Sequence, residues 1–164
     1  MLISYRCFLT VFLCGFANLA AVHAEDIDNK KGVLSRLAPE IGTYNSDKVL
    51  GDPSVSAELQ RRLGTKGMAM LKERLVVQGP IAFDGTSLVL HGGMAHAADT
   101  DAAIVSVRPR DGQVQVAIRV GGREVLQSID QFMPQSPQGD VQRQAVEWAK
   151  ASGSRVRDLQ PSAR

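Results

Sequence analysis

The chain has 164 residues, of which 44% are hydrophobic, with 19 Lys and Arg against 17 Asp and Glu. A formal net charge of +2 provides no strong field for attracting nucleic acid or an anionic membrane, so neither is expected as a partner. This length suits one small domain built around a single hydrophobic core.

Residues 1–24 are predicted to be a cleavable signal peptide. Arg6 supplies a short positive region, an apolar run extends from Cys7 to about Val22, and Ala24 precedes the charged stretch EDIDNKK. The apolar run is shorter than the ~20 residues that span a bilayer, which disfavours the alternative of a retained membrane anchor. Cleavage is expected after Ala24, and the loss of Arg6 leaves a mature chain with a formal charge of +1.

Both cysteines, Cys7 and Cys14, lie inside this leader. The mature chain is therefore expected to use no disulfide, although export brings it to a compartment that permits them. It also has no cysteine nucleophile, and the sequence contains no G-x-S-x-G motif of a serine hydrolase. No enzymatic activity is predicted.

Residues 25–51 are polar and are predicted to be irregular, with short apolar islands. The first clear helix begins with Asp52 as N-cap and Pro53 in the first helical position, where its missing N–H has no partner to lose. Gly64 is predicted to end this helix, and Thr65 to begin a second one. The apolar positions that recur at four-residue spacing are Val55, Leu59 and Leu63 in the first helix and Leu71 and Leu75 in the second.

From Leu75 onward the apolar period changes from about four residues to two, which predicts β-strands. The five strand candidates, separated by Asp-Gly or Gly-Gly turns, are LVVQGPIAF, TSLVLHG, AAIVSVRP, QVQVAIRV and REVLQSI. Short turns imply antiparallel neighbours. The alternation in QVQVAIRV predicts a sheet with one buried face and one face in water.

Asp140 is predicted to cap a C-terminal helix, VQRQAVEWAK, whose apolar stripe packs on the sheet. The stripe consists of Val141, Ala145, Trp148 and Ala149. The polar tail, residues 153–164, is predicted to be disordered. The fold class is therefore α+β: an antiparallel sheet of about five strands packed against short N-terminal helices and a C-terminal helix.

One connection between predicted strands is longer than a hairpin needs. It reads HGGMAHAADT and places His96 among small residues. Connections longer than necessary are often functional, whereas an exposed turn residue without a role is the plain alternative. A third hypothesis is a metal-dependent enzyme, although the spacing matches no zinc pattern and no metal or cofactor is expected. Its candidate ligands are His91, His96, Asp99 and Asp101.

The chain resembles the Ivy family, periplasmic inhibitors of vertebrate (c-type) lysozyme found in Gram-negative bacteria. The similarity runs from Ile41 to Ser128, and its most specific part is an ordered series: VQGPI, a strand, the His-bearing loop and an A-x-x-V strand. The resemblance implies a periplasmic inhibitor with an Ivy-like domain over 52–152. It further implies a c-type lysozyme or another peptidoglycan hydrolase as partner, and it allows a homodimer.

In that family the loop carries a C-x-P-H-x-C pattern whose cysteines form a disulfide, and its histidine meets the two catalytic carboxylates of lysozyme. Aligned on His96, the cysteine positions here are Gly93 and Ala98, and the proline position is Ala95. The resemblance therefore implies an inhibitory loop over 92–99, with Met94 as an adaptable apolar contact. Its expected contact residues are Gly93, Met94, Ala95, His96, Ala97 and Ala98.

The missing disulfide and proline, together with Gly92 and Gly93, are expected to give this loop more freedom. A disulfide closing so short a loop contributes about 2 kcal/mol, which is at most roughly thirtyfold in affinity. Its absence favours the alternative hypothesis, a non-inhibitory Ivy-fold protein that serves as an accessory binding module of the envelope.

Overall fold

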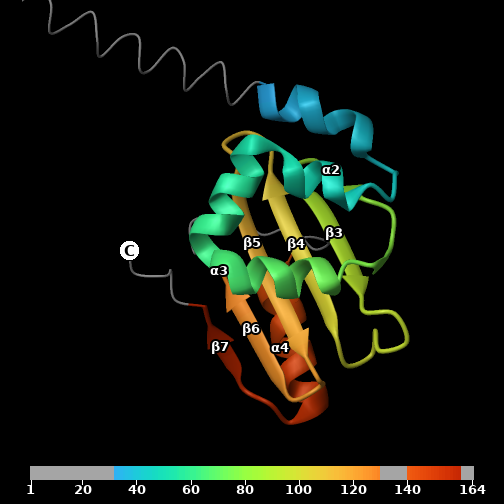
Figure 1. Cartoon of the computed structure of the whole chain (residues 1–164), viewed down its shortest axis with the longest axis vertical. Coiled ribbons are helices and arrows are strands. Elements are labelled where there is room, and N and C mark those ends of the chain that lie inside the picture. The colour runs from blue at the N-terminus through green and yellow to red at the C-terminus, as the bar shows by residue number, and fades with distance from the viewer. Residues whose placement is uncertain (1–31, 130–139, 160–164) are drawn as a thin grey trace, which may run out of the picture.

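The structure, a computed structural model, describes residues 32–129 and 140–159. The predicted signal peptide with its cleavage site and residues 160–164 of the tail lie outside the described residues. One sheet forms the middle layer, with helix α3 (Pro53–Glu73) across one face and helix α4 (Val141–Ser152) on the other (Figure 1). No helix in the described ranges combines the length and apolar character needed to cross a membrane.

Short helical elements precede α3 where the sequence predicted an irregular segment. Residues 32–37 are helical, and η1 (Ala38–Glu40) and α2 (Ser46–Gly51) follow. Val33 and Val49 are at most 2% exposed and join the main core. The apolar islands of this segment therefore supply core side chains, and they are too short for their periodicity to reveal a helix.

Helix α3 begins and bends where the sequence predicted. The Asp52 side chain accepts hydrogen bonds from the backbone N–H groups of Ser54 and Val55, and Pro53 lies in the first turn. Gly64 has a φ of 63° and a ψ of −178°, so a non-helical residue divides α3 into two halves. Such a φ suits glycine because it has no β-carbon to clash with the backbone. The predicted N-cap and the predicted break between two helices are confirmed.

The sheet has the order β1-β3-β4-β5-β6-β7, with β2 also paired to β3. All its pairs are antiparallel except β6 with β7, which is parallel. The α+β class is confirmed, while the strand count and the purely antiparallel arrangement are corrected. The strands are β1 (Val77–Gln78), β2 (Ala82–Phe83), β3 (Leu88–Gly93), β4 (Ala102–Arg108), β5 (Gln113–Val120), β6 (Glu124–Ser128) and β7 (Val156–Asp158).

Two differences account for the corrected count. The single strand predicted over LVVQGPIAF is divided into β1 and β2 around Gly79 and Pro80, because proline has no N–H to donate to a ladder. Strand β7 lies where the sequence predicted a disordered tail. Its position is supported by a hydrogen bond of 2.6 Å from the Leu159 N–H to the Gln127 carbonyl. The α4 crossover makes this parallel pairing possible.

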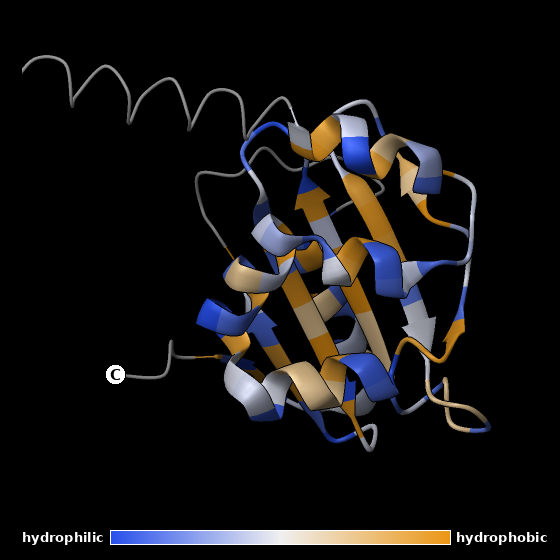
Figure 2. Ribbon diagram, turned by 45° about the horizontal axis from the view of Figure 1, so that its top comes forward, coloured by the Kyte–Doolittle hydropathy of each residue, from blue (hydrophilic) through white to orange (hydrophobic). Residues whose placement is uncertain are grey.

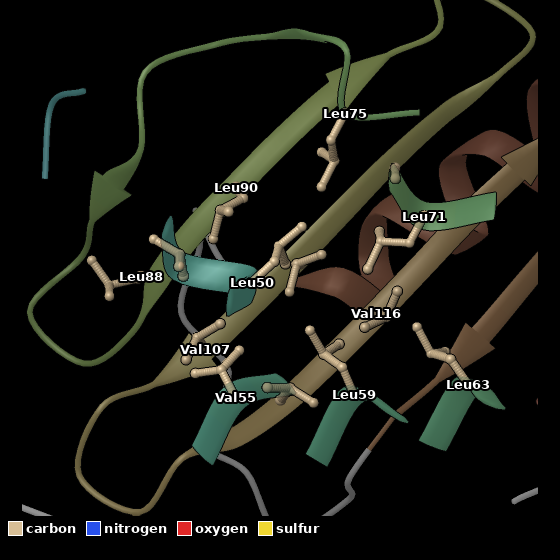
Figure 3. Close-up of a cluster of buried hydrophobic side chains, with 14 of the residues drawn as sticks. Leu50, Val55, Leu59, Leu63, Leu71, Leu75, Leu88, Leu90, Val107 and Val116 are labelled. Atoms are coloured by element: carbon tan, nitrogen blue, oxygen red, sulfur yellow. The ribbon is translucent and has the colours of Figure 1, made fainter. Parts of the chain in front are cut away.

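The sheet is buried on both faces, which corrects the prediction of a face in water. On the α3 side, leucines of α2 and α3 pack on side chains such as Leu90 and Val116 (Figure 3). On the other side, Ala117 of β5 packs with Val141 and Ala145 of α4, as predicted for that helix. Even Gln115 is only 1% exposed. Figure 2 shows hydrophobic residues concentrated on these central strands.

Candidate functional site

The loop over residues 94–101 joins β3 to β4 and extends beyond one end of the sheet (Figure 1). Its two ends meet at the pair Gly93 and Ala102, the last rung of the β3–β4 ladder. Within the loop, Ala95, His96 and Ala98 are exposed, and Met94 and Ala97 are partly buried. The expected partner-contacting residues thus lie together in one accessible segment. The exception is Gly93, which is buried at the end of β3.

His96 lies at the bend of this loop in an unusual backbone conformation. It is the one non-glycine residue with a positive φ, 63°, in the described part of the chain. The Ala97 N–H donates to the Met94 carbonyl at 3.1 Å, which closes a β-turn with His96 in its third position. Type II turns need a positive φ there and favour glycine or asparagine. The left-handed conformation costs an L-residue roughly 1–2 kcal/mol, and such strain is concentrated at functional sites.

The imidazole of His96 is available to a partner. It makes no hydrogen bond or ion pair with any residue in the described ranges, and the residue is exposed. An imidazole donates a hydrogen bond from one ring nitrogen and accepts one at the other, or donates from both when protonated. At this position it can therefore meet acidic groups of another molecule without breaking an internal contact.

Gly93 and Ala98, which align with the two loop cysteines of the family that the chain resembles, are in direct contact. A β-carbon added to Gly93 would lie 2.4 Å from the Ala98 β-carbon and 2.7 Å from its α-carbon. The two glycines that are expected to loosen the loop both lie in β3. A β-carbon on Gly92 would lie 2.8 Å from the Val77 carbonyl oxygen and 3.2 Å from that of Arg74. Both glycines belong to β3 and allow neighbouring backbone to approach closely.

The far end of the loop is held by the carboxylate of Asp101. Its Oδ1 accepts hydrogen bonds from Arg74 Nη2 at 2.6 Å and from the Gly121 N–H at 3.1 Å, and its Oδ2 accepts one from Thr100 Oγ1 at 3.1 Å. Burial by itself would raise the pKa of Asp101. The hydrogen bonds from Gly121, Arg74 and Thr100 outweigh it and hold that pKa below its ordinary value.

The turn between β5 and β6 supports the same part of the loop. The Gly122 N–H donates to the Thr100 carbonyl at 2.8 Å, and the Arg119 guanidinium donates to the Asp99 carbonyl. Within the loop, the Asp101 N–H donates to the Ala97 carbonyl at 2.7 Å. The loop is therefore ordered by hydrogen bonds along its exit, without any covalent link.

The candidate metal ligands are not brought together. His91 lies on the α4 side of β3, and its Nε2 is 2.5 Å from where a β-carbon on Gly79 would lie. His96 is at the loop bend, and Asp101 is engaged by Arg74. Within residues 32–129 and 140–159, no three His, Cys, Asp or Glu side chains form a group that could hold a metal ion.

Arg74 and Val77 are the neighbours of the loop that the sequence did not indicate. Val77 of β1 pairs with Gly93 and is 54% exposed, so it provides an apolar contact at the base of the loop, and Val76, the residue before it, is 66% exposed. Arg74 is 27 positions from Asp101, and no local pattern links two residues at that distance. The sequence predicted a role for Asp101 only as a metal ligand.

Comparison with known proteins gives one match. The family model described as inhibitor of vertebrate lysozyme (Ivy) matches residues 54–150, which is more than half of the chain. The matched region runs from the first turn of α3 into α4 and includes the loop at 94–101. Neither the curated proteins nor the solved structures contain a match to this chain.

Proposed function

The chain belongs to the Ivy family of vertebrate lysozyme inhibitors, and we propose that it blocks a c-type lysozyme or a related peptidoglycan-cleaving glycosidase with the loop at 94–101. In this proposal His96 enters the active-site cleft and meets the two catalytic carboxyl groups. Family membership supports a lysozyme inhibitor in general. The observation that carries the loop mechanism is the exposed, unpartnered His96 with its positive φ at the loop bend.

The chemistry of the target explains why a histidine is effective there. A glycosidase of this type uses two carboxyl groups that flank the scissile bond, one acting as an acid and one ionised. An imidazole accepts a hydrogen bond from the protonated carboxyl and donates one to the carboxylate, and a protonated ring pairs with the carboxylate as a cation. The ring then occupies the space that the sugar and the attacking water require.

The shape of the loop favours entry into a cleft. His96 is flanked by Ala95 and Ala97, whose short side chains add little width around the imidazole. The backbone hydrogen bonds from Ala97 to Met94 and from Asp101 to Ala97 already hold the bend in the free protein. Less conformational entropy is therefore lost on binding than for a mobile loop. This ordering supports inhibition over the non-inhibitory alternative, which rested on the missing disulfide.

The loop needs a neighbouring surface to form a stable complex. Standard protein–protein interfaces bury about 800 Å² on each partner, more than a short loop of small residues supplies. Exposed Val77 lies at the base of the loop, paired with Gly93, and extends the contact. We include it in the proposed interface as an apolar contact beside the inserted loop.

The proposed location is the periplasm, where an inhibitor meets lysozyme that has crossed the outer membrane. The sequence of residues 1–24, with Arg6, its apolar run and Ala24, supports this location. Fractionation of Gram-negative cells that produce the full chain tests it, with mass spectrometry of the mature N-terminus. An intact leader in the membrane fraction would contradict cleavage after Ala24.

The inhibition itself is tested by following lysis of a cell-wall suspension by a c-type lysozyme, with and without the mature protein. Wild type should inhibit, and His96→Asn should lose most of the inhibition because asparagine suits the turn but has no imidazole. Lys72→Ala, on the exposed side of α3, is the matched control and should inhibit like wild type. No inhibition by wild type at large excess would remove c-type lysozyme as the target. Full inhibition by His96→Asn would overturn the loop mechanism.

A further inference from the structure

The loop at 94–101 and the end of α3 are joined by one buried ion pair. Arg74 is 5% exposed, and its Nη2 lies 2.6 Å from Asp101 Oδ1. We propose that Arg74 is a positioning residue: it holds the exit of the loop so that His96 is presented in its binding conformation before a partner arrives. This inference rests on the proposed function, because it assigns Arg74 a role in inhibition through His96.

The guanidinium of Arg74 connects three separate parts of the fold. Its Nε donates to the Arg119 carbonyl of β5 at 2.9 Å, its Nη1 donates to the Met70 carbonyl of α3 at 3.1 Å, and its Nη2 donates to Asp101. The planar fork of arginine can make all these bonds at once, whereas a lysine ammonium has no such geometry. The loop is thus tied to both the helix and the central sheet.

Asp101 transmits this constraint to the bend of the loop through its backbone. Its carbonyl accepts from the Met94 N–H at 2.8 Å, and its N–H donates to the Ala97 carbonyl at 2.7 Å. Met94 and Ala97 are the first and last residues of the turn that contains His96. Fixing the Asp101 side chain therefore fixes both ends of the turn, and with them the direction of the imidazole.

The burial of the pair makes the loop sensitive to its loss. The side chains of Arg74 and Asp101 are 7% and 14% exposed, so water replaces a missing partner poorly. Removing Arg74 leaves the Asp101 carboxylate without its cationic partner and with only the hydrogen bonds from Gly121 and Thr100. For this reason we expect Arg74→Met to release the exit of the loop, while the sheet, to which the Arg74 guanidinium donates at the Arg119 carbonyl, keeps its core.

Hydrogen exchange of the free protein tests the positioning role without any partner. In Arg74→Met, the backbone amides of Met94, Ala97 and Asp101 should exchange at least about tenfold faster than in wild type, because a hydrogen-bonded charged pair is lost. Amides of β4 and β5 that pair in the sheet should keep their protection. Arg62→Met is the matched control: it removes a buried arginine of α3, 2.6 Å from Glu58, and should leave the loop amides unchanged.

Inhibition provides the second readout. Arg74→Met should weaken inhibition of c-type lysozyme by about tenfold, and Arg74→Lys should restore only part of it. In a His96→Asn background the same Arg74→Met change should have almost no further effect, because the imidazole it positions is gone. An equal loss in both backgrounds would mean that Arg74 acts on stability alone and would overturn the proposal.

The two proposals can fail separately. If wild type inhibits no lysozyme but Arg74→Met still frees the loop amides, the proposed function is wrong while the ordering by Arg74 holds. If wild type inhibits and the loop amides are as protected in Arg74→Met as in wild type, the positioning role is wrong. Should Arg74→Met fail to fold, Asp101→Ala replaces it, since alanine has no oxygen to accept from the Arg74 guanidinium. Unchanged loop exchange in Asp101→Ala would likewise overturn the positioning role.

Discussion

Gly93 and Ala98 close the loop by direct contact, since a β-carbon on Gly93 would lie 2.4 Å from that of Ala98. In the Ivy family, as the resemblance implies, the residues at these two positions are cysteines that form a disulfide. Here the absence of a side chain on Gly93 lets Ala98 pack against the backbone of β3. The loop thus stays closed at its base without a covalent bond.

Gly93→Ala is expected to destabilise the fold, by about 1–3 kcal/mol, because the added methyl group overlaps Ala98. Ala98→Gly in the same chain removes the overlapping β-carbon and should recover part of that loss, since the Ala98 α-carbon would still lie 2.7 Å from the added methyl group. Urea unfolding followed by circular dichroism measures both. A double variant as unstable as Gly93→Ala would show that the β-carbon of Ala98 is not the cause.

Gly93→Cys combined with Ala98→Cys should form a disulfide under oxidising conditions. Disulfides need β-carbons about 3.5–4.5 Å apart, and those of residues 93 and 98 would lie 2.4 Å apart, so the loop must move outward by roughly 1–2 Å to accept it. Because hydrogen bonds already order the loop, we expect affinity for c-type lysozyme to rise by less than about tenfold. Titration of oxidised and reduced protein checks this, and weaker binding when oxidised would show that the outward shift misplaces His96.

The positive φ of His96 predicts an order of stability among its variants. His96→Gly should be more stable than His96→Ala by about 1 kcal/mol, since glycine adopts a φ of 63° without the β-carbon clash. His96→Asn should lie between them. Thermal unfolding of the three proteins tests this order, and equal stabilities would indicate that the turn relaxes in solution.

The lowered pKa of Asp101 predicts a pH-dependent share of the stability. Its pKa is lowered in the folded state, so its contribution is fully present above the unfolded pKa of about 4 and is lost as the pH falls through the folded pKa. The difference in unfolding free energy between wild type and Asp101→Asn should therefore be largest near neutral pH and shrink below about pH 4. Other paired acids, such as Asp52, contribute equally to the unfolding free energy of both proteins, so their contributions cancel in the difference. A difference that grows in acid would contradict the ion pair.

Much of the local structure could be predicted from short stretches of sequence. The cap at Asp52, the break at Gly64 and the capped helix after Asp140 depend on residues within a turn of each other, and all are confirmed. Likewise, the long connection around His96 was visible between two strand patterns. Local hydrogen bonds and steric limits act over a few residues, so the sequence carries them directly.

The sequence alone determined the α+β class, the main breaks between elements and the loop that carries His96. The tertiary structure decided what holds that loop, because Arg74 and Asp101 meet only after α3 folds across the sheet. It also decided that both faces of β5 are buried. Alternating apolar and polar residues predicted that one face of this strand lies in water, but α4 covers that face. Such contacts join residues far apart in the chain, and only the packing of whole elements brings them together.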